Sequence, residues 1–304
     1  MASTHDYKTD QRNNDIEIYI NGEFFHRSKA FVSVMDSGFL LGDGVWEGIR
    51  LHNNYLVHLD SHLDRLYKGA KEIGINIGLN REEIKKAINK TLVKNKMKSN
   101  VHIRLIISRG LKKTPYQHPS FTISKPTFVI IPEYKQPDPS IKKNGIRIAT
   151  VKTRRDHKVQ NPQVNSLSKH NCIAACIEAD NLGVDEGLML DPYDNVSTCN
   201  STNFFIVKNK EILTSTGEFC LNGVTRESII RLCSENKIPI FQKDFKIDKV
   251  HTADEIFVTG TFAGVIPVIS IDNIVIGDGI RGTITKNLQD WYSLDLDNIV
   301  MQNE

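Results

Sequence analysis

Three segments of the chain carry residue types that could hold a phosphate or another anion. In NGVTRESII, residues 222–230, a glycine precedes Thr225, which begins an expected helix, and the unpaired N–H groups of a first helical turn attract anions. In VTGT, residues 258–261, a strand enters the turn Thr259-Gly260-Thr261, where backbone amides and the threonine hydroxyls can donate hydrogen bonds. Arg65, in HLDRL, is the third candidate, with a surface ion pair as its alternative interpretation.

Histidine and cysteine spacing gives two further candidates, each with an ordinary structural explanation. His58 and His62 are four residues apart, as metal ligands on a helix can be, but no third ligand is evident and we expect no metal site. Cys172 and Cys176 are one helical turn apart, while the other three cysteines are scattered. Reduced thiols are the favoured interpretation, and a redox or metal-binding use of the pair is the alternative.

Composition excludes several classes of partner. The chain has 304 residues with 39% hydrophobic content, enough for two ordinary domains with a buried core in each. Its 39 Lys and Arg against 36 Asp and Glu give a net charge of +3, too small to predict a nucleic-acid or membrane partner. No apolar run reaches the length of a membrane span, and the first fourteen residues are polar, so we expect a cytoplasmic protein.

Along the chain, the first secondary-structure elements that the sequence predicts are two β-hairpins. Residues 16–33 alternate apolar and polar types about an Asn-Gly pair at 21–22. Residues 46–60 repeat this alternation about an Asn-Asn pair at 53–54. Because such pairs favour tight turns between antiparallel strands, both segments predict β-hairpins.

Helices and further strands follow these hairpins. Apolar residues at helical spacing predict amphipathic helices over 61–75 and 81–97, the first of them capped by Ser61. The runs VHIRLIIS at 101–108 and TFVIIP at 127–132 are typical of strands. Antiparallel hairpins with two helices predict an α+β domain.

A proline-rich stretch, PEYKQPDPS, separates this domain from a second one that is also mixed and richer in β-structure. In the second domain we expect a strand over 146–152, a helix that opens within the 162–179 stretch, strands near 187–191, 203–213, 255–259 and 265–276, a helix over about 225–236, and a short helix near 283–292. The expected organisation is a flexible tail over 1–15, a small α/β domain over 16–131, a linker over 132–144, and a larger β-rich α/β domain over 145–304.

Six segments resemble, in order, the class IV aminotransferases, the fold-type-IV family that uses pyridoxal 5′-phosphate (PLP) and includes branched-chain and D-amino acid aminotransferases. The segments are MDSGFLLGDGVWEGIR, HLDRLYKGAKEIGI, SLSKHNCIAACIEA, EGLMLDPYDNVSTCNSTNFFIV, GVTRESII and TGTFAGVIPV. The resemblance implies an α+β fold of the D-amino acid aminotransferase type, with two mixed α/β domains and the site between them. It also implies a homodimer and a small-molecule substrate or phosphorylated ligand.

The resemblance gives roles to the anion-binding candidates. The family's phosphate-binding arginine corresponds to Arg65, its Ile-Thr phosphate contact to Val224 and Thr225, and its last phosphate threonine to Thr261. Asn203 keeps the asparagine that ends a Glu-Gly-Ser-Gly-Glu-Asn-like run. Arg50, Arg109, Arg154 and Arg155 match family arginines, with substrate-carboxylate and surface roles both open.

Two positions depart from the family where its chemistry is centred. The lysine that bonds to PLP corresponds to Asn165, and an amide cannot form that covalent bond. The glutamate that keeps the pyridine nitrogen protonated corresponds to Thr198, whose hydroxyl carries no charge, so the ring would be a poorer electron sink. Conventional transamination is therefore expected to be absent or altered.

Lys169 offers a replacement for the missing amine. It lies four residues after Asn165, so if the helix has begun there, both side chains share one face about 6 Å apart. Burial among apolar neighbours would lower the pKa of its amine into a useful range. The alternative interpretations are that Lys169 fills the family's aromatic position beside the ring, or caps a surface.

Three hypotheses remain open. The first is a class IV aminotransferase-like enzyme that acts on an amino acid or a related small amine with altered chemistry. The second is a non-catalytic PLP-binding or phosphate-binding regulatory homologue. The third is an enzyme of the same fold that uses no PLP.

Overall fold

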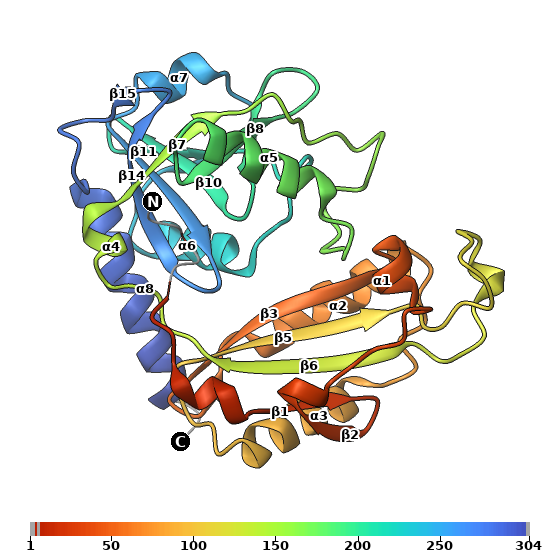
Figure 1. Cartoon of the computed structure of the whole chain (residues 1–304). Coiled ribbons are helices and arrows are strands. Elements are labelled where there is room, and N and C mark those ends of the chain that lie inside the picture. The colour runs from red at the N-terminus through yellow and green to blue at the C-terminus, as the bar shows by residue number, and fades with distance from the viewer. Residues whose placement is uncertain (1–3, 5–6, 302–304) are drawn as a thin grey trace. The chain divides into compact units, whose positions relative to one another are not determined.

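The computed structural model describes residue 4 and residues 7–301, which form two compact units (Figure 1). The N-terminal unit comprises Thr9–Gln136 together with Val164–Lys169. The C-terminal unit comprises Pro137–Gln163 and His170 onward, with residues 4, 7 and 8. Among the described residues, no helix is long and apolar enough to cross a membrane.

The N-terminal unit is built on a six-stranded antiparallel sheet in the order β2-β1-β6-β5-β3-β4. Both expected hairpins are confirmed: β1 pairs with β2 around residues 21–22, and β3 pairs with β4 around residues 53–54. All four turn residues have positive φ, which suits the twist of the flanking strands. The strands are β1 Glu17–Ile20, β2 Glu23–His26, β3 Gly44–His52, β4 Tyr55–Leu56, β5 Val101–Ser108 and β6 Thr127–Tyr134.

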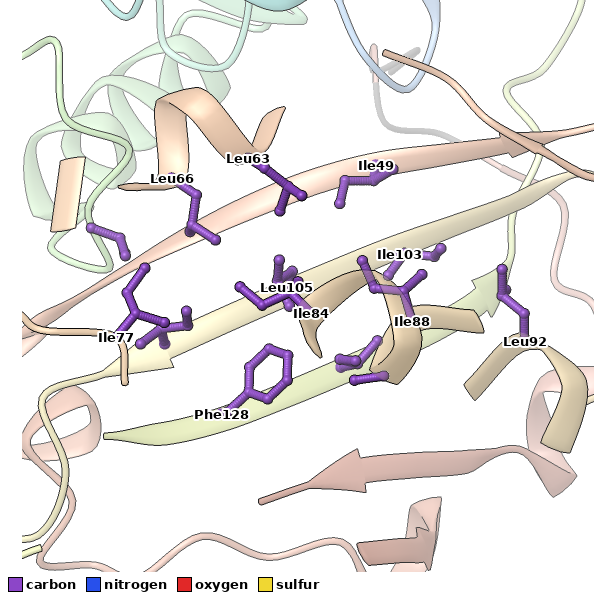
Figure 2. Packing of buried hydrophobic residues seen from close by; sticks show 14 of the residues in the cluster. Ile49, Leu63, Leu66, Ile77, Ile84, Ile88, Leu92, Ile103, Leu105 and Phe128 are labelled. Atoms are coloured by element: carbon purple, nitrogen blue, oxygen red, sulfur yellow. The ribbon is translucent and has the colours of Figure 1, made fainter. Parts of the chain in front are cut away.

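Helices α2 (Leu59–Glu72) and α3 (Arg81–Lys94) cover one face of this sheet and close a hydrophobic core. Figure 2 shows Leu63 and Leu66 of α2 and Ile84 and Ile88 of α3 directed toward sheet residues such as Leu105. The expected cap is wrong: α2 begins at Leu59 after His58, so Ser61 lies inside its first turn. The short helix α1 is Ser37–Leu41, and 3₁₀ turns occur at Gln11–Asp15, Arg27–Lys29 and Pro119–Phe121.

The segment Val164–Lys169 runs beside β3, far from it in sequence. Trp46 N donates to Asn165 O at 3.0 Å, and Leu167 N donates to Gly44 O at 2.9 Å. Val164 is buried in the core of the same unit. This backbone pairing ties the segment to the N-terminal sheet.

The C-terminal unit contains a nine-stranded sheet in the order β12-β11-β10-β13-β14-β7-β8-β9, with β15 paired to β14. The pairs β11-β12, β14-β7 and β7-β8 are parallel, and the others are antiparallel. The strands are β7 Ile146–Thr150, β8 Glu186–Leu190, β9 Val196–Cys199, β10 Asn203–Lys208, β11 Glu211–Thr214, β12 Ile240–Gln242, β13 Glu255–Gly260, β14 Gly264–Ile271 and β15 Ile274–Val275.

The described part of the C-terminal unit also contains helices. They are α4 Ile141–Asn144, α5 His170–Asn181, α6 Val224–Glu235, α7 Ile247–His251 and α8 Thr283–Met301. The strand expected over 203–213 is instead a hairpin of β10 and β11 that turns at two positive-φ residues, Asn209 and Lys210. The expected short helix near 283–292 extends to Met301, because Leu288, Tyr292, Leu296 and Val300 repeat at helical spacing and are all buried.

Candidate functional site

Arg65, on α2, is held by a buried carboxylate. Its Nε donates to Glu47 Oε1 at 2.8 Å and its Nη2 donates to Glu47 Oε2 at 2.7 Å. Glu47 lies on β3 and is fully buried, while the Arg65 side chain is 16% exposed. The pair is therefore not the surface ion pair considered from the sequence, and its two parallel hydrogen bonds fix the guanidinium plane.

A second buried side chain completes this cluster. His62 Nδ1 lies 2.7 Å from Glu47 Oε2, one turn before Arg65 on the same helix. Burial opposes ionisation of Glu47, but the Arg65 charge and the hydrogen bonds from Arg65 and His62 outweigh it and hold the pKa of Glu47 below its usual value. His62 thus orients a carboxylate, and the described residues contain no cluster of His, Cys, Asp and Glu suited to a metal.

Asn165 and Lys169 are in direct contact. Lys169 Nζ donates to Asn165 Oδ1 at 3.1 Å, and Asn165 Nδ2 donates to the backbone oxygen of Trp46 at 2.7 Å. The ammonium also lies 5.4 Å from the centre of the Trp46 ring, and the Arg104 guanidinium lies 4.0 Å from the same ring. Two cations therefore share one indole, whose π face attracts positive charge.

The local geometry that joins these two side chains differs from the expected one. Helix α5 begins at His170, so Asn165 and Lys169 are not on a shared helical face. The chain turns instead, with Ser168 N donating to Ser166 Oγ at 3.0 Å. The expected proximity of the two side chains is confirmed, but a tight turn and not a helix produces it.

Close glycines make room for this turn. A Cβ at Gly44 would lie 2.4 Å from Ile107 O and 2.5 Å from Leu167 Cδ1. Gly42 has φ +65°, and a Cβ there would lie 3.1 Å from Ser168 Cα. The Gly-Asp-Gly run at 42–44, whose last residue begins β3, therefore lets the 164–169 segment approach.

Thr198 lies on β9 in the C-terminal unit and is buried. Its hydroxyl donates to the backbone oxygen of Thr202 at 2.7 Å, and the same oxygen accepts from Cys199 N at 3.0 Å. Because the Thr198 proton is directed at Thr202, the Thr198 oxygen presents lone pairs to any other neighbour.

Glu186 lies behind this turn and was not singled out from the sequence. Its carboxylate accepts from Thr202 Oγ1 at 2.6 Å, from Ser201 Oγ at 2.7 Å and from Thr4 Oγ1. Burial raises the pKa of Glu186, although its hydroxyl partners oppose the shift. The carboxylate fixes the 199–202 turn between Thr198 and Asn203.

The start of α6 is open to an acceptor. Val224 and Thr225 begin the helix, and its N-cap, Gly223, has no side chain to bond the first N–H groups. A Cβ at Gly223 would lie 2.2 Å from Asn203 Oδ1, so only glycine fits against that amide. Asn203 Nδ2 donates to Leu221 O at 2.8 Å and so holds the loop before the helix.

Thr259, which belongs to the expected anion-binding segment 258–261, adds a second hydroxyl. It faces Asn203 as its cross-strand partner between β13 and β10, and it precedes Thr261 by two residues. Its Oγ1 is buried and has no hydrogen-bond partner among residues 4 and 7–301, which is uncommon for a hydroxyl in a protein interior. An orphaned hydroxyl near an uncapped helix start fits a bound phosphate, and the signal in the sequence was the first threonine of VTGT.

The sequence-predicted site residues thus fall into two sets. Arg65, Asn165 and Lys169 lie in the N-terminal unit. The residues in the C-terminal unit are Thr198, Asn203, Val224, Thr225 and Thr261. Of the other arginines considered, Arg109 is bound to Asp43 and to two backbone oxygens, and Arg154 pairs with Asp194 at the surface.

Comparison with known proteins gives a consistent result. The family model described as amino-transferase class IV matches residues 44–271. The chain is 38% identical over 279 residues to the putative branched-chain-amino-acid aminotransferase of Methanocaldococcus jannaschii, covering 91% of this chain and 95% of that protein. It is also 38% identical over 275 residues to branched-chain-amino-acid aminotransferase-like protein 2 of Arabidopsis thaliana, covering 90% of this chain and 49% of the relative. The chain therefore spans about half the length of that plant protein.

A solved structure shows the same likeness. The branched-chain aminotransferase of the thermophilic archaeon Thermoproteus uzoniensis, crystallised with norvaline, aligns with a TM-score of 0.83. The two are 29% identical, and the alignment covers 92% of this chain and 94% of that chain. The expected fold class, α+β with two sheets, is confirmed.

Proposed function

Because the chain belongs to the class IV aminotransferases, we propose that it uses PLP to act on an amino acid or a related small amine, with Lys169 as the source of the reactive amine. Position 165, which the family resemblance gives to the lysine, carries an amide instead. The proposed reaction therefore differs from conventional transamination in two ways. The amine is at position 169 and not at 165, and Thr198 takes the place of the glutamate that pairs with the pyridine nitrogen.

The contact between Lys169 and Asn165 carries this proposal. An ammonium group lies 3.1 Å from the side chain at the position where the resemblance expects one, and both residues belong to the same unit. Both polar atoms of the Asn165 amide are hydrogen-bonded: Nδ2 donates to Trp46 O, and Oδ1 accepts from Lys169 Nζ. In this proposal Asn165 positions the Lys169 amine.

Two contacts hold the Lys169 amine in place. The Trp46 ring lies 5.4 Å from the ammonium nitrogen, and Asn165 Oδ1 accepts its hydrogen bond at 3.1 Å. A neutral amine is the form that attacks a carbonyl carbon and carries protons. Trp46 and Asn165 together restrict the side chain, which lowers the entropy lost when it reacts.

The C-terminal unit supplies residues that fit the phosphate of PLP. The first N–H groups of α6 at Val224 and Thr225, the hydroxyl of Thr261 and the orphaned hydroxyl of Thr259 are all donors, as phosphate oxygens require. When bound, PLP supplies an aldehyde that bonds to an amine and a ring that accepts electrons. In the N-terminal unit Arg65 offers a guanidinium whose orientation Glu47 fixes.

Thr198 supports altered chemistry. Its hydroxyl proton is directed at Thr202 O, so toward a ring nitrogen it would act as an uncharged acceptor. An uncharged acceptor stabilises a protonated nitrogen less than a carboxylate does. We therefore expect the ring to withdraw electrons less strongly than in a transaminase that has a glutamate at the position of Thr198.

Borohydride reduction tests the proposal directly. Protein incubated with PLP, reduced and digested should carry the phosphopyridoxyl mass on the peptide that contains Lys169. Lys169→Met should abolish this adduct while Lys158→Met, a change of an exposed lysine in the preceding loop, should leave it intact. PLP that binds with its phosphate but is never fixed by borohydride would contradict the role of Lys169 and favour the non-catalytic binding protein. Absence of any PLP binding would contradict the proposal as a whole.

A further inference from the structure

Arg155 is a buried guanidinium with no carboxylate partner among the described residues. It is 9% exposed, and its Nη2 donates to Pro162 O at 3.1 Å. Its Nη1 donates to Asn171 Oδ1 at 3.3 Å and to Cys172 Sγ at 3.4 Å, while its buried Nε has no partner. A desolvated cation without a counter-charge strongly favours an anion at the atoms it touches.

Cys172 is the neighbour of Arg155 that can become an anion. It stands in the first turn of α5, a helix of twelve residues, where the free N–H groups and the helix dipole stabilise negative charge. Its side chain is partly exposed, so small molecules can reach the sulfur. A helix start together with a guanidinium is the environment in which cysteine thiolates form.

Cys176, one turn further along α5, has the opposite environment. Desolvation, followed by the charges of Glu186 and Cys172, raises the pKa of its thiol, and the Asn200 amide opposes this only in part. Cys176 therefore stays protonated near neutral pH although it lies on the exposed side of the helix. The two thiols of one helix form a natural comparison, because only one of them contacts a cation.

We infer that Cys172 is a reactive thiolate and a site of oxidative modification by small hydroperoxides, independent of the proposed PLP chemistry. The Cys172 sulfur attacks the outer oxygen of the hydroperoxide and the O–O bond breaks. Sulfur loses two electrons and becomes a sulfenic acid, while the departing alkoxide or hydroxide takes a proton from water. Arg155 acts as a positioning residue, because it stabilises the thiolate before the attack.

Competitive alkylation tests the thiolate. The full-length protein is treated with a limiting amount of iodoacetamide at pH 7, and the labelled peptides are quantified by mass spectrometry. Cys172 should be labelled roughly tenfold faster than Cys176, because only the Cys172 sulfur accepts a hydrogen bond from a guanidinium among the described residues. Equal rates at the two cysteines would overturn the inference.

The role of Arg155 is tested by a matched pair of variants. Arg155→Met should slow the labelling of Cys172 at pH 7 by about tenfold and leave Cys176 unchanged. Arg154→Met removes the neighbouring arginine, which pairs with Asp194 at the surface, and should change neither rate. An unchanged Cys172 rate in Arg155→Met with normal circular dichroism would refute the inference.

The wild-type protein gives a second measurement if Arg155→Met fails to fold. At pH 7, hydrogen peroxide should oxidise Cys172 before Cys176, and oxidation of both thiols at the same rate would contradict the inference. Hydrogen peroxide followed by dimedone should then place an adduct on Cys172. No adduct on Cys172 under conditions that label free cysteine would equally count against it.

Discussion

At position 47 a single carboxylate joins two side chains of the N-terminal unit. Glu47 is completely buried and bonds to Arg65 and His62, which balance its charge. Removing one member of such a cluster leaves the other charge buried and unpaired. The candidate phosphate-binding arginine is thus tied to the stability of its own unit.

Glu47→Gln is therefore expected to lower the free energy of unfolding by about 3 kcal/mol at pH 7, measured by urea denaturation. Asp64→Asn, which removes an exposed ion pair with Arg81, is the control and should cost at most about 1 kcal/mol. Similar losses in the two variants would show that the Glu47 cluster contributes no more than a surface pair.

The same carboxylate sets a pH dependence. Because the folded state holds the pKa of Glu47 below its unfolded value of about 4.3, its stabilisation is present above that pH and is lost as the pH falls through the folded pKa. In urea titrations below pH 4.3 the wild type should lose its advantage over Glu47→Gln. A difference between the two proteins that stays constant down to the acid transition would contradict this assignment.

The position of the amine gives a third prediction at the residue scale. In Asn165→Lys with Lys169→Met the chain again has one amine in this turn, now at position 165. We expect borohydride to fix PLP on residue 165 in this double variant, with the adduct located by peptide mapping. Loss of the adduct from both positions, with PLP still bound, would mean that Lys169 is not replaceable by a lysine at the family position.

At the scale of elements, β3 and the 164–169 segment depend on each other. Their two backbone hydrogen bonds form only because glycines precede and begin β3. Overpacking at such a contact must displace backbone, which cannot rotate away as a side chain does. Strand β3, more than a hundred residues earlier in the chain, thus positions the 164–169 segment.

Gly44→Ala should consequently destabilise the protein by about 1–3 kcal/mol and reduce the borohydride adduct on Lys169. Gly69→Ala in α2 is the matched control, because a Cβ there would lie 3.5 Å from Val164 Cγ1 in ordinary contact. That helical substitution should leave stability unchanged or raise it by up to about 1 kcal/mol. The adduct and the thermal midpoint are measured together, and equal behaviour of the two variants would argue against the role of β3.

At the scale of the whole molecule, each unit has its own core and its own set of candidate residues. The N-terminal unit carries the amine and a fixed guanidinium, and the C-terminal unit carries the open start of α6 with threonine hydroxyls. A ligand that binds the folded chain stabilises all of it by mass action. A change in the free energy of unfolding on adding ligand therefore detects binding to the candidate residues of either unit.

PLP at about 100 times its Kd should raise the free energy of unfolding by about 2.7 kcal/mol. Thr225→Val should remove most of this increase at the same PLP concentration, because it removes a hydroxyl from the first turn of α6. Thr216→Val, at an exposed position of the same unit, should keep the full increase. An undiminished increase in Thr225→Val would exclude the start of α6 as the phosphate site.

The sequence by itself determined the local elements and the family. The hairpins at 21–22 and 53–54, the strand over 101–108 and the helix expected over about 225–236 follow from turn residues and periodicity, which act within a few positions of the chain. Only the tertiary structure decided that Lys169 precedes its helix yet touches Asn165, that Glu47 fixes Arg65, and that Thr259 is left without a partner. The physical reason is that these contacts depend on backbone turns and on residues distant in sequence, whose approach no local pattern encodes.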